Sequence, residues 1–188
     1  MNEVGISEES PKAKIEGEVE EGAIIRGPVY IAKGAKVEST AMVIGPTWIG
    51  SDTEIRHGSY IRGYVYAGRS CVLGHASEFK GSVLLYEAKA RHFAYVGDSI
   101  LGRGVNLGAG TKIANLKLKG DSVAFTHPST NEKMDSGLRK FGALMGDGSQ
   151  TGCNAVLSPG SILMPESSVM SCSHFRGTLG VGKLFVQK

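Results

Sequence analysis

The stretch VEEGAIIRGPVYIAKGAKVESTAMVIGPTWIGSDTEIRHGSYIRGYVYAGRSCVLGHASEF, residues 19–79, places an apolar residue at every sixth position. With 41% of the chain apolar, so long a run of hits on one of six phases has a chance probability of roughly a few in ten thousand, so the repeat is real. A helical period would drift off its face within two steps, and strict alternation would make the intervening even positions apolar as well. The repeat positions are Val19, Ile25, Ile31, Val37, Val43, Ile49, Ile55, Ile61, Ala67, Leu73 and Phe79.

A hexad repeat indicates an all-β fold, the parallel β-helix, in which each hexad is one short strand plus a corner. Three hexads close a triangular coil, so we expect about seven coils and a prism roughly 34 Å long. Beyond Phe79 the phase continues with two five-residue steps, to Leu84 and to Leu101, and such departures predict a functional region. Residues 119–143 break the repeat and predict an inserted loop or short hairpin, whereas residues 1–14 predict a polar tail.

Composition argues against several classes of function. The net charge of +3 includes no long basic run, which argues against a nucleic-acid partner and leaves room for a small anionic ligand. The three cysteines show no CxxC spacing, so they indicate neither a disulfide framework nor a thiolate zinc site. No stretch approaches the ~20 apolar residues of a membrane span, and the acidic start lacks the features of a signal peptide. We therefore expect a cytoplasmic protein without a membrane partner.

A second stretch, GHASEFKGSVLLYEAKARHFAYVGDSILGRGVNLGAGTKIANLKL at residues 74–118, is rich in polar residues. It resembles the acetyltransferase domain of bifunctional N-acetylglucosamine-1-phosphate uridyltransferases. Residues 135–162, together with ANLKL, also resemble the C-terminal domain of archaeal-type sugar-1-phosphate nucleotidyltransferases that acetylate amino-sugar phosphates. The resemblance implies that residues 15–188 form a left-handed parallel β-helix, a hexapeptide-repeat acyltransferase-like domain, and that it assembles as a homotrimer with active sites between subunits.

The implied activity is transfer of an acetyl group from acetyl-CoA to the amine of an amino-sugar 1-phosphate, such as a glucosamine-1-phosphate-like acceptor, with no metal required. Amide formation from a thioester needs an unprotonated amine, so the first requirement is a base, which typically contributes ~10²- to 10⁴-fold. His92 meets this requirement, and the resemblance gives it the same catalytic role. The resemblance also places Asn115 near the transferred acyl group.

Arg62 and Lys80 are predicted to bind the phosphate of the sugar. They lie 18 residues apart, which is one coil, so they should stack on one edge of the prism and could clamp a single phosphate. The resemblance implies the same pair, and it adds Tyr95 and Asn106 as residues that hold the amino sugar.

The resemblance also implies a track for the acyl donor. Backbone near Ala109 would contact the pantetheine arm, and Gly152 with Cys153 would contact it further along the coil. No partner base for a Cys153 nucleophile is marked in the sequence, so we expect this thiol to be buried and structural.

Two other classes of function compete with this interpretation. His57, His75 and His92 occupy the same place in successive coils, and histidine clusters on trimeric β-helices bind zinc in gamma-class carbonic anhydrases. Those enzymes carry a histidine pair five residues apart, but the residue five positions after His75 is Lys80, a cation that disfavours a metal. The other alternative is a non-catalytic regulatory or scaffold trimer related to nucleotidyltransferase C-terminal domains.

Overall fold

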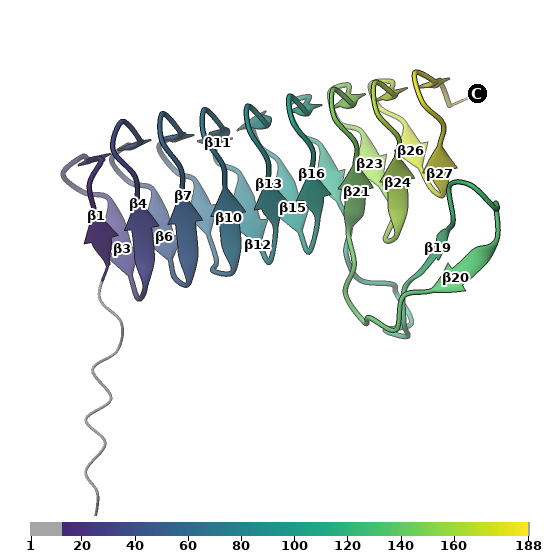
Figure 1. The fold of residues 1–188 in the computed structure, drawn as a ribbon, viewed down its shortest axis with the longest axis horizontal. Coiled ribbons are helices and arrows are strands. Elements are labelled where there is room, and N and C mark those ends of the chain that lie inside the picture. Colours follow the sequence, from purple (N-terminus) through teal and green to yellow (C-terminus); the bar gives the residue numbers. More distant parts are fainter. Residues whose placement is uncertain (1–12, 188) are drawn as a thin grey trace, which may run out of the picture.

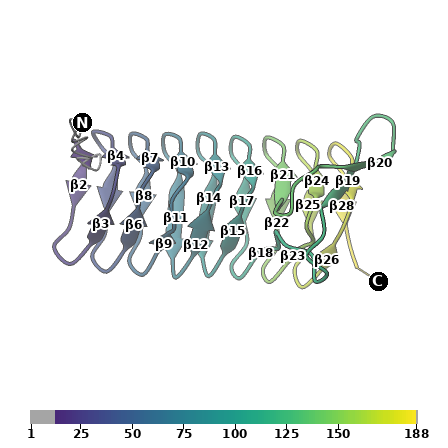
Figure 2. The ribbon, with the colours of Figure 1, turned by 90° about the horizontal axis from the view of Figure 1, so that it is seen from below.

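Each hexad supplies one short strand of a three-sided prism, which the computed structural model describes over residues 13–187 (Figures 1 and 2). Sheet A contains β1 (Lys14–Ile15), β4 (Val29–Ile31), β7 (Thr47–Ile49), β10 (Val65–Ala67), β13 (Val83–Leu84), β16 (Ile100–Leu101), β21 (Ala143–Met145), β24 (Ser161–Leu163) and β27 (Thr178–Leu179). Sheet B contains β2 (Glu18–Val19), β5 (Lys36–Val37), β8 (Glu54–Ile55), β11 (Val72–His75), β14 (Lys89–His92), β17 (Asn106–Leu107), β22 (Gln150–Thr151), β25 (Ser168–Val169) and β28 (Leu184–Phe185). Sheet C contains β3 (Ile24–Arg26), β6 (Met42–Ile44), β9 (Tyr60–Ile61), β12 (Glu78–Lys80), β15 (Tyr95–Gly97), β18 (Lys112–Ile113), β23 (Val156–Leu157) and β26 (His174–Phe175).

The chain visits sheets A, B and C in turn, and every strand of these sheets pairs in parallel with its counterpart one coil away. The predicted all-β hexapeptide-repeat solenoid is therefore confirmed. Sheets A and B each contain nine strands, so the expected number of about seven coils is too low. The strands at the two open ends of the solenoid carry exposed apolar residues, such as Ile15 in β1 and Leu184 in β28.

The core is a single column of inward-facing hexad residues. From Ile31 to Phe79 every predicted repeat position is completely buried, and Phe79 is among the largest of these side chains. Val19 and Ile25 are half-buried and pack against the end of the same column. Residues 13–187 contain no helix that is long and apolar enough to cross a membrane.

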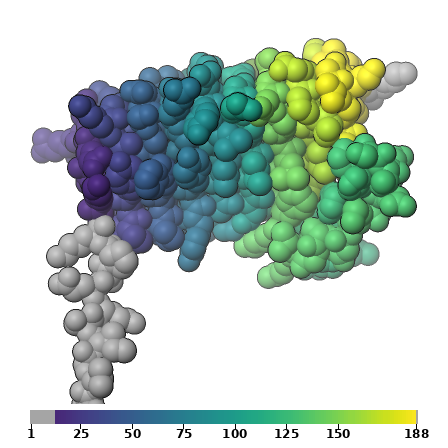
Figure 3. Space-filling model, viewed as in Figure 1, coloured from purple at the N-terminus to yellow at the C-terminus, as the bar shows by residue number. Residues whose placement is uncertain are grey.

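The inserted segment leaves the prism after β18 and returns at β21 (Figures 1 and 2). It contains an antiparallel hairpin of β19 (Ala124–Thr126) and β20 (Lys133–Asp135), and a bridge between Leu116 and Lys140 closes its base. Figure 3 shows this segment, in green, bulging from the C-terminal end of the prism. The tail predicted for residues 1–14 lies outside the described residues except for its last two positions, of which Lys14 begins β1.

Candidate active site

Sheet C and its two corners carry most of the predicted site residues. We call the turn that leads from sheet B into sheet C the B–C corner, and the turn that leads from sheet C into sheet A the C–A corner. His92 ends β14 at the B–C corner, whereas Lys80 ends β12 at the C–A corner. Between the corners lies a three-residue strand such as β15, which spans about 10 Å.

A half-buried ionic cluster occupies the C–A corner. The Lys80 ammonium lies 2.7 Å and 3.0 Å from the two oxygens of Asp98, one coil further on. The amide of Asn115, in the next coil, donates to the same carboxylate. The Lys80 and Asp98 side chains are only 26% and 21% exposed, and Asn115 is 8% exposed, so each group depends on the others for its polar contacts.

The two five-residue steps lie at this cluster. The steps pass through Gly81 and Asp98, which both adopt positive φ angles, of 56° and 47°. These tight turns bring the Lys80 and Asp98 side chains of neighbouring coils together. The two irregular steps therefore lie at the half-buried ionic cluster, and their role as markers of a functional region stays a prediction.

Gly97 makes room for two further side chains beside this cluster. A Cβ atom at Gly97 would lie 2.6 Å from the Asn115 amide nitrogen and 2.7 Å from the Tyr95 hydroxyl. The Tyr95 and Asn115 side chains therefore converge over Gly97, in space that only glycine leaves free. Asn115 does not lie beside His92, because the two residues are at opposite ends of sheet C.

Arg62 lies one coil before Lys80 at the C–A corner, as predicted, but each cation already has a carboxylate partner. The Arg62 guanidinium donates to Glu78 at 2.7 Å, and this hydrogen bond raises the pKa of Arg62. Sequence reasoning missed both Glu78 and Asp98 as partners. The spacing of 18 residues from Lys80 to Asp98, close to one coil, places Asp98 near Lys80, but spacing alone does not pair the two side chains.

His92 is exposed, and its ring makes no hydrogen bond to another of the residues 13–187. The expected histidine column is formed only in part at the B–C corner. The rings of His57 and His75 stack with centroids 4.1 Å apart, but the ring that packs against the other side of His75 belongs to Phe93. The backbone of His92 is in register with that of His75, so the departure lies in the side chains.

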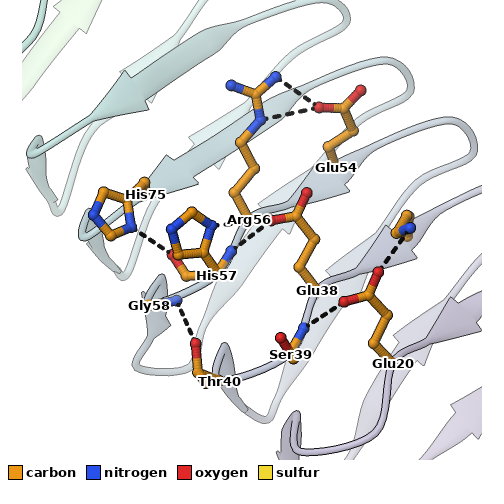
Figure 4. A network of polar contacts seen from close by, with 10 residues as sticks. Glu20, Glu38, Ser39, Thr40, Glu54, Arg56, His57, Gly58 and His75 are labelled. Atoms are coloured by element: carbon orange, nitrogen blue, oxygen red, sulfur yellow. Dashed lines mark hydrogen bonds and ion pairs between the residues drawn. The ribbon is translucent and has the colours of Figure 1, made fainter.

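Figure 4 shows how the His57–His75 pair is held. Glu38 accepts a hydrogen bond from the backbone of His57 at 2.8 Å, and this bond lowers the pKa of Glu38. The Nδ1 atom of His75 lies 3.0 Å from the carbonyl oxygen of His57, so this nitrogen carries the proton. Residues 13–187 contain no cluster of three or more histidine, cysteine or acidic side chains that could hold a metal ion.

The predicted donor residues follow His92 along the B–C corner. The backbone N–H of Gly110 donates to the backbone carbonyl of His92 at 3.0 Å. One coil further on, the backbone N–H of Asn154 donates to the backbone carbonyl of Ala109 at 2.8 Å. A Cβ at Gly108 would lie 2.6 Å from the Cys153 nitrogen, so glycine is needed where these coils approach. Four predicted residues thus lie in a row over three coils: His92, Ala109, Gly152 and Cys153.

The Cys153 side chain is exposed, so the expectation of a buried thiol at this position was wrong. The buried cysteine is Cys71.

Asn106 lies apart from the other predicted sugar-binding residues. It belongs to β17 of sheet B, where its side-chain oxygen accepts a hydrogen bond from Arg91 at 3.2 Å. Tyr95 and Lys80 lie on sheet C. A single chain therefore does not bring Asn106 to the same surface as the C–A corner cluster.

Comparison with known proteins finds partial matches. The family described as "GMPPB C-terminal domain" matches residues 43–130, slightly less than half of the chain. A bifunctional sugar-1-phosphate nucleotidylyltransferase/acetyltransferase of Sulfurisphaera tokodaii is 34% identical over 55% of this chain and 25% of its own length. The bifunctional protein GlmU of Methanocaldococcus jannaschii is 39% identical over 78% of this chain and 35% of its own length.

Among solved structures, PerB from Caulobacter crescentus in complex with CoA and GDP-perosamine matches with a TM-score of 0.41 and 15% identity, over 86% of this chain and 53% of that chain. The chain spans about a quarter to a third of the two curated relatives described above. As its motifs predict, the chain resembles the hexapeptide-repeat, acetyltransferase-type β-helix domain of bifunctional sugar-1-phosphate nucleotidylyltransferases.

Proposed function

We propose that the protein is an acyl-CoA-dependent N-acetyltransferase that acetylates an amino-sugar 1-phosphate. The observation that carries this proposal is the layout of sheet C. An exposed imidazole, His92, lies at one end, and two cations, Lys80 and Arg62, lie at the other end, about 10 Å away along the strand direction and respectively one and two coils earlier across the sheet. An acceptor laid across sheet C would place its amine toward His92 and its phosphate toward the cations.

The proposed reaction needs one proton acceptor. The amine nitrogen attacks the thioester carbonyl while His92 takes a proton from the nitrogen. A carbon–nitrogen bond forms and the carbon–sulfur bond breaks, and the departing thiolate is protonated to give free CoA. His92 suits this step because its ring is exposed and makes no competing hydrogen bond to any other of the residues 13–187.

A screen of amino sugars, their 1-phosphates and nucleotide-linked amino sugars with acetyl-CoA, reading the released thiol, tests the proposal. We expect turnover with a phosphorylated amino sugar. Absence of turnover with every acceptor would leave the alternative of a non-catalytic scaffold or regulatory trimer. The pairing of both cations with carboxylates is the observation that favours this alternative.

The phosphate clamp predicts separate effects on acceptor and donor. Replacement of Arg62 by alanine should raise the acceptor KM about tenfold, the loss expected for one charge-assisted hydrogen bond, and leave the donor KM unchanged. Lys80→Met should do the same, and it also removes the ammonium that pairs with Asp98, while the hydrogen bond from Asn115 to Asp98 remains. Arg56, which pairs with Glu54 on another surface, supplies the matched control Arg56→Ala. Unchanged acceptor KM values in both variants would contradict the clamp.

The donor track predicts protection of one thiol. Cys153 is exposed within the proposed track, so saturating CoA should slow its alkylation by iodoacetamide several-fold, as followed by peptide mass spectrometry. Cys71 is the internal control, because burial raises the pKa of its thiol and removes it from solvent. Cys71 should stay unlabelled with or without CoA. Equal labelling of Cys153 in both samples would place the donor elsewhere.

We propose a homotrimer, because Asn106 can join Tyr95 and Lys80 at one site only if they come from different copies of the chain. The outer face of sheet A also carries an apolar row that association would bury. Successive strands in register contribute Tyr30, Trp48, Tyr66, Val83, Ile100 and Leu144. The Tyr30 and Trp48 rings lie 4.1 Å apart, and Trp48 is 46% exposed.

Light scattering should therefore give a mass near three times 19.8 kDa. A double variant, Trp48→Glu with Ile100→Glu, should shift the mass toward that of one chain, because it introduces charge into the apolar row. The control Lys36→Glu changes charge on sheet B and should leave the mass unchanged. A monomeric wild type at micromolar concentration would contradict the trimer.

A further inference from the structure

The inserted segment and the outer face of sheet C enclose a groove beyond the candidate active site. The groove has a volume of about 450 Å³ and begins at Ala114, one residue before Asn115. A second hollow of about 320 Å³ continues from it and shares Ala124, Lys133, Pro159 and Arg176. The groove therefore extends from the C–A corner cluster to the hairpin, along the last coils of the prism.

The groove is cationic. Four cations, Lys117, Lys119, Lys133 and Arg176, line it, and no aspartate or glutamate lines either hollow. Lys117 is neutralised by Asp121 at 2.8 Å. Within residues 13–187, the other three cations form no ion pair. A surface that gathers unpaired cations from two separate parts of the chain attracts an anion.

The remaining lining is apolar and open. Leu118 is fully exposed, Leu116 is 41% exposed and Val156 is 36% exposed, and Pro159 adds a further apolar surface. His174 contributes a hydrogen-bonding side chain, whose Nε2 lies 2.7 Å from the Ser158 hydroxyl. A simple inorganic anion would bind to the cations but leave the apolar surface exposed to water. A phosphorylated ligand with a planar apolar group would use both.

We propose that this groove binds the phosphates of a nucleotide between Lys119, Lys133 and Arg176, with the base against Leu116 and Leu118. Two sources share this chemistry: the nucleotide end of coenzyme A and a nucleotide-linked sugar. The choice of these two probes rests on the proposed function. The binding itself does not, because it can be measured without turnover.

Isothermal titration calorimetry with CoA, UDP-N-acetylglucosamine and inorganic pyrophosphate tests the inference. We expect one of the two nucleotides to bind more tightly than pyrophosphate, since only the nucleotides offer a base to the leucines. The double variant Lys133→Glu with Arg176→Glu should weaken that nucleotide about tenfold or more. Lys33→Glu, an exposed lysine of the N-terminal coils, is the matched control and should bind like the wild type.

The titrations with the two nucleotides distinguish the two sources of the ligand. Weakening of CoA alone would assign the groove to the acyl donor, and weakening of UDP-N-acetylglucosamine alone would assign it to a nucleotide-linked sugar. Unchanged affinity of both nucleotides in the double variant, with circular dichroism showing a folded protein, would overturn the inference. Pyrophosphate binding at least as tightly as both nucleotides would overturn it as well. Nucleotide binding that depends on these cations, in a protein without transferase activity, would uphold the inference while the proposed function failed.

Discussion

Replacement of His92 by alanine should lower kcat for acetyl transfer by about 100-fold or more, with little change in the KM for acetyl-CoA. The expected loss is kinetic rather than structural. The His92 side chain is exposed and makes no hydrogen bond to any other of the residues 13–187, so its removal leaves no cavity and no unpaired polar group. Steady-state kinetics of the purified variant, with the best acceptor from the screen, measure the effect.

The matched control for this variant is His57→Ala. His57 lies at the same corner, but its ring is stacked on His75 and anchored near Glu38, away from the donor row. Its removal should change kcat by less than about twofold, because it touches neither proposed substrate. Part of the His92→Ala loss should be recovered at high pH, where more of the acceptor amine is already unprotonated. Near wild-type activity of His92→Ala at neutral pH would exclude His92 as the base.

The fold could be predicted from the sequence because one buried residue recurs in each hexad. Ile31, Ile49 and Ala67 show the mechanism: they are 18 residues apart, fully buried and directly paired in sheet A. No other common architecture gives such a period, so the pattern alone selects a triangular solenoid.

The candidate site was predicted less completely, because it depends on side-chain pairing between coils. Periodicity places Arg62 and Lys80 on one edge, but it does not say that Glu78 and Asp98 neutralise them. The histidine column shows the same limit. Phe93 adopts a φ of 52° directly after His92, and its ring takes the place against His75 that the spacing had offered to an imidazole.

The burial of each cysteine follows from its position within the hexad. Cys71 and Cys153 both follow a hexad strand, yet Cys71 is buried with its thiol 3.0 Å from the carbonyl oxygen of Leu85, whereas Cys153 is exposed. The two thiols occupy different positions of the hexad: Cys71 lies two residues before the repeat residue Leu73, a position that is also buried in other coils, whereas Cys153 lies two residues after Thr151. The pattern therefore carried a signal for the exposure of Cys153, and the expectation of a buried thiol overlooked it.

Replacement of Gly97 by alanine should lower kcat/KM by about 100-fold, the scale of loss expected when site groups are displaced by about 1 Å. A Cβ at this position would lie 2.6 Å and 2.7 Å from polar atoms of Asn115 and Tyr95, so both side chains must move. Both obstacles are the ends of side chains, and for this reason the solenoid should stay folded. Gly74 differs, because a Cβ there would collide with the backbone carbonyl of Arg91 and would strain the coil itself.

Kinetics and thermal unfolding of three variants separate a local effect on the site from a general loss of stability. Gly180→Ala is the matched control: the nearest atom to its new Cβ would be the Lys183 side chain at 3.5 Å, an ordinary contact, so activity and melting temperature should stay near wild type. Gly97→Ala should lose activity with a melting temperature only a few degrees lower, whereas Gly74→Ala should lose stability by several kcal/mol or fail to fold. The site would then depend on Gly97 because a hydrogen atom is all that fits between Tyr95 and Asn115. Wild-type kcat/KM in Gly97→Ala would show that these two side chains do not need their observed positions for catalysis, and would remove them from the proposed acceptor site.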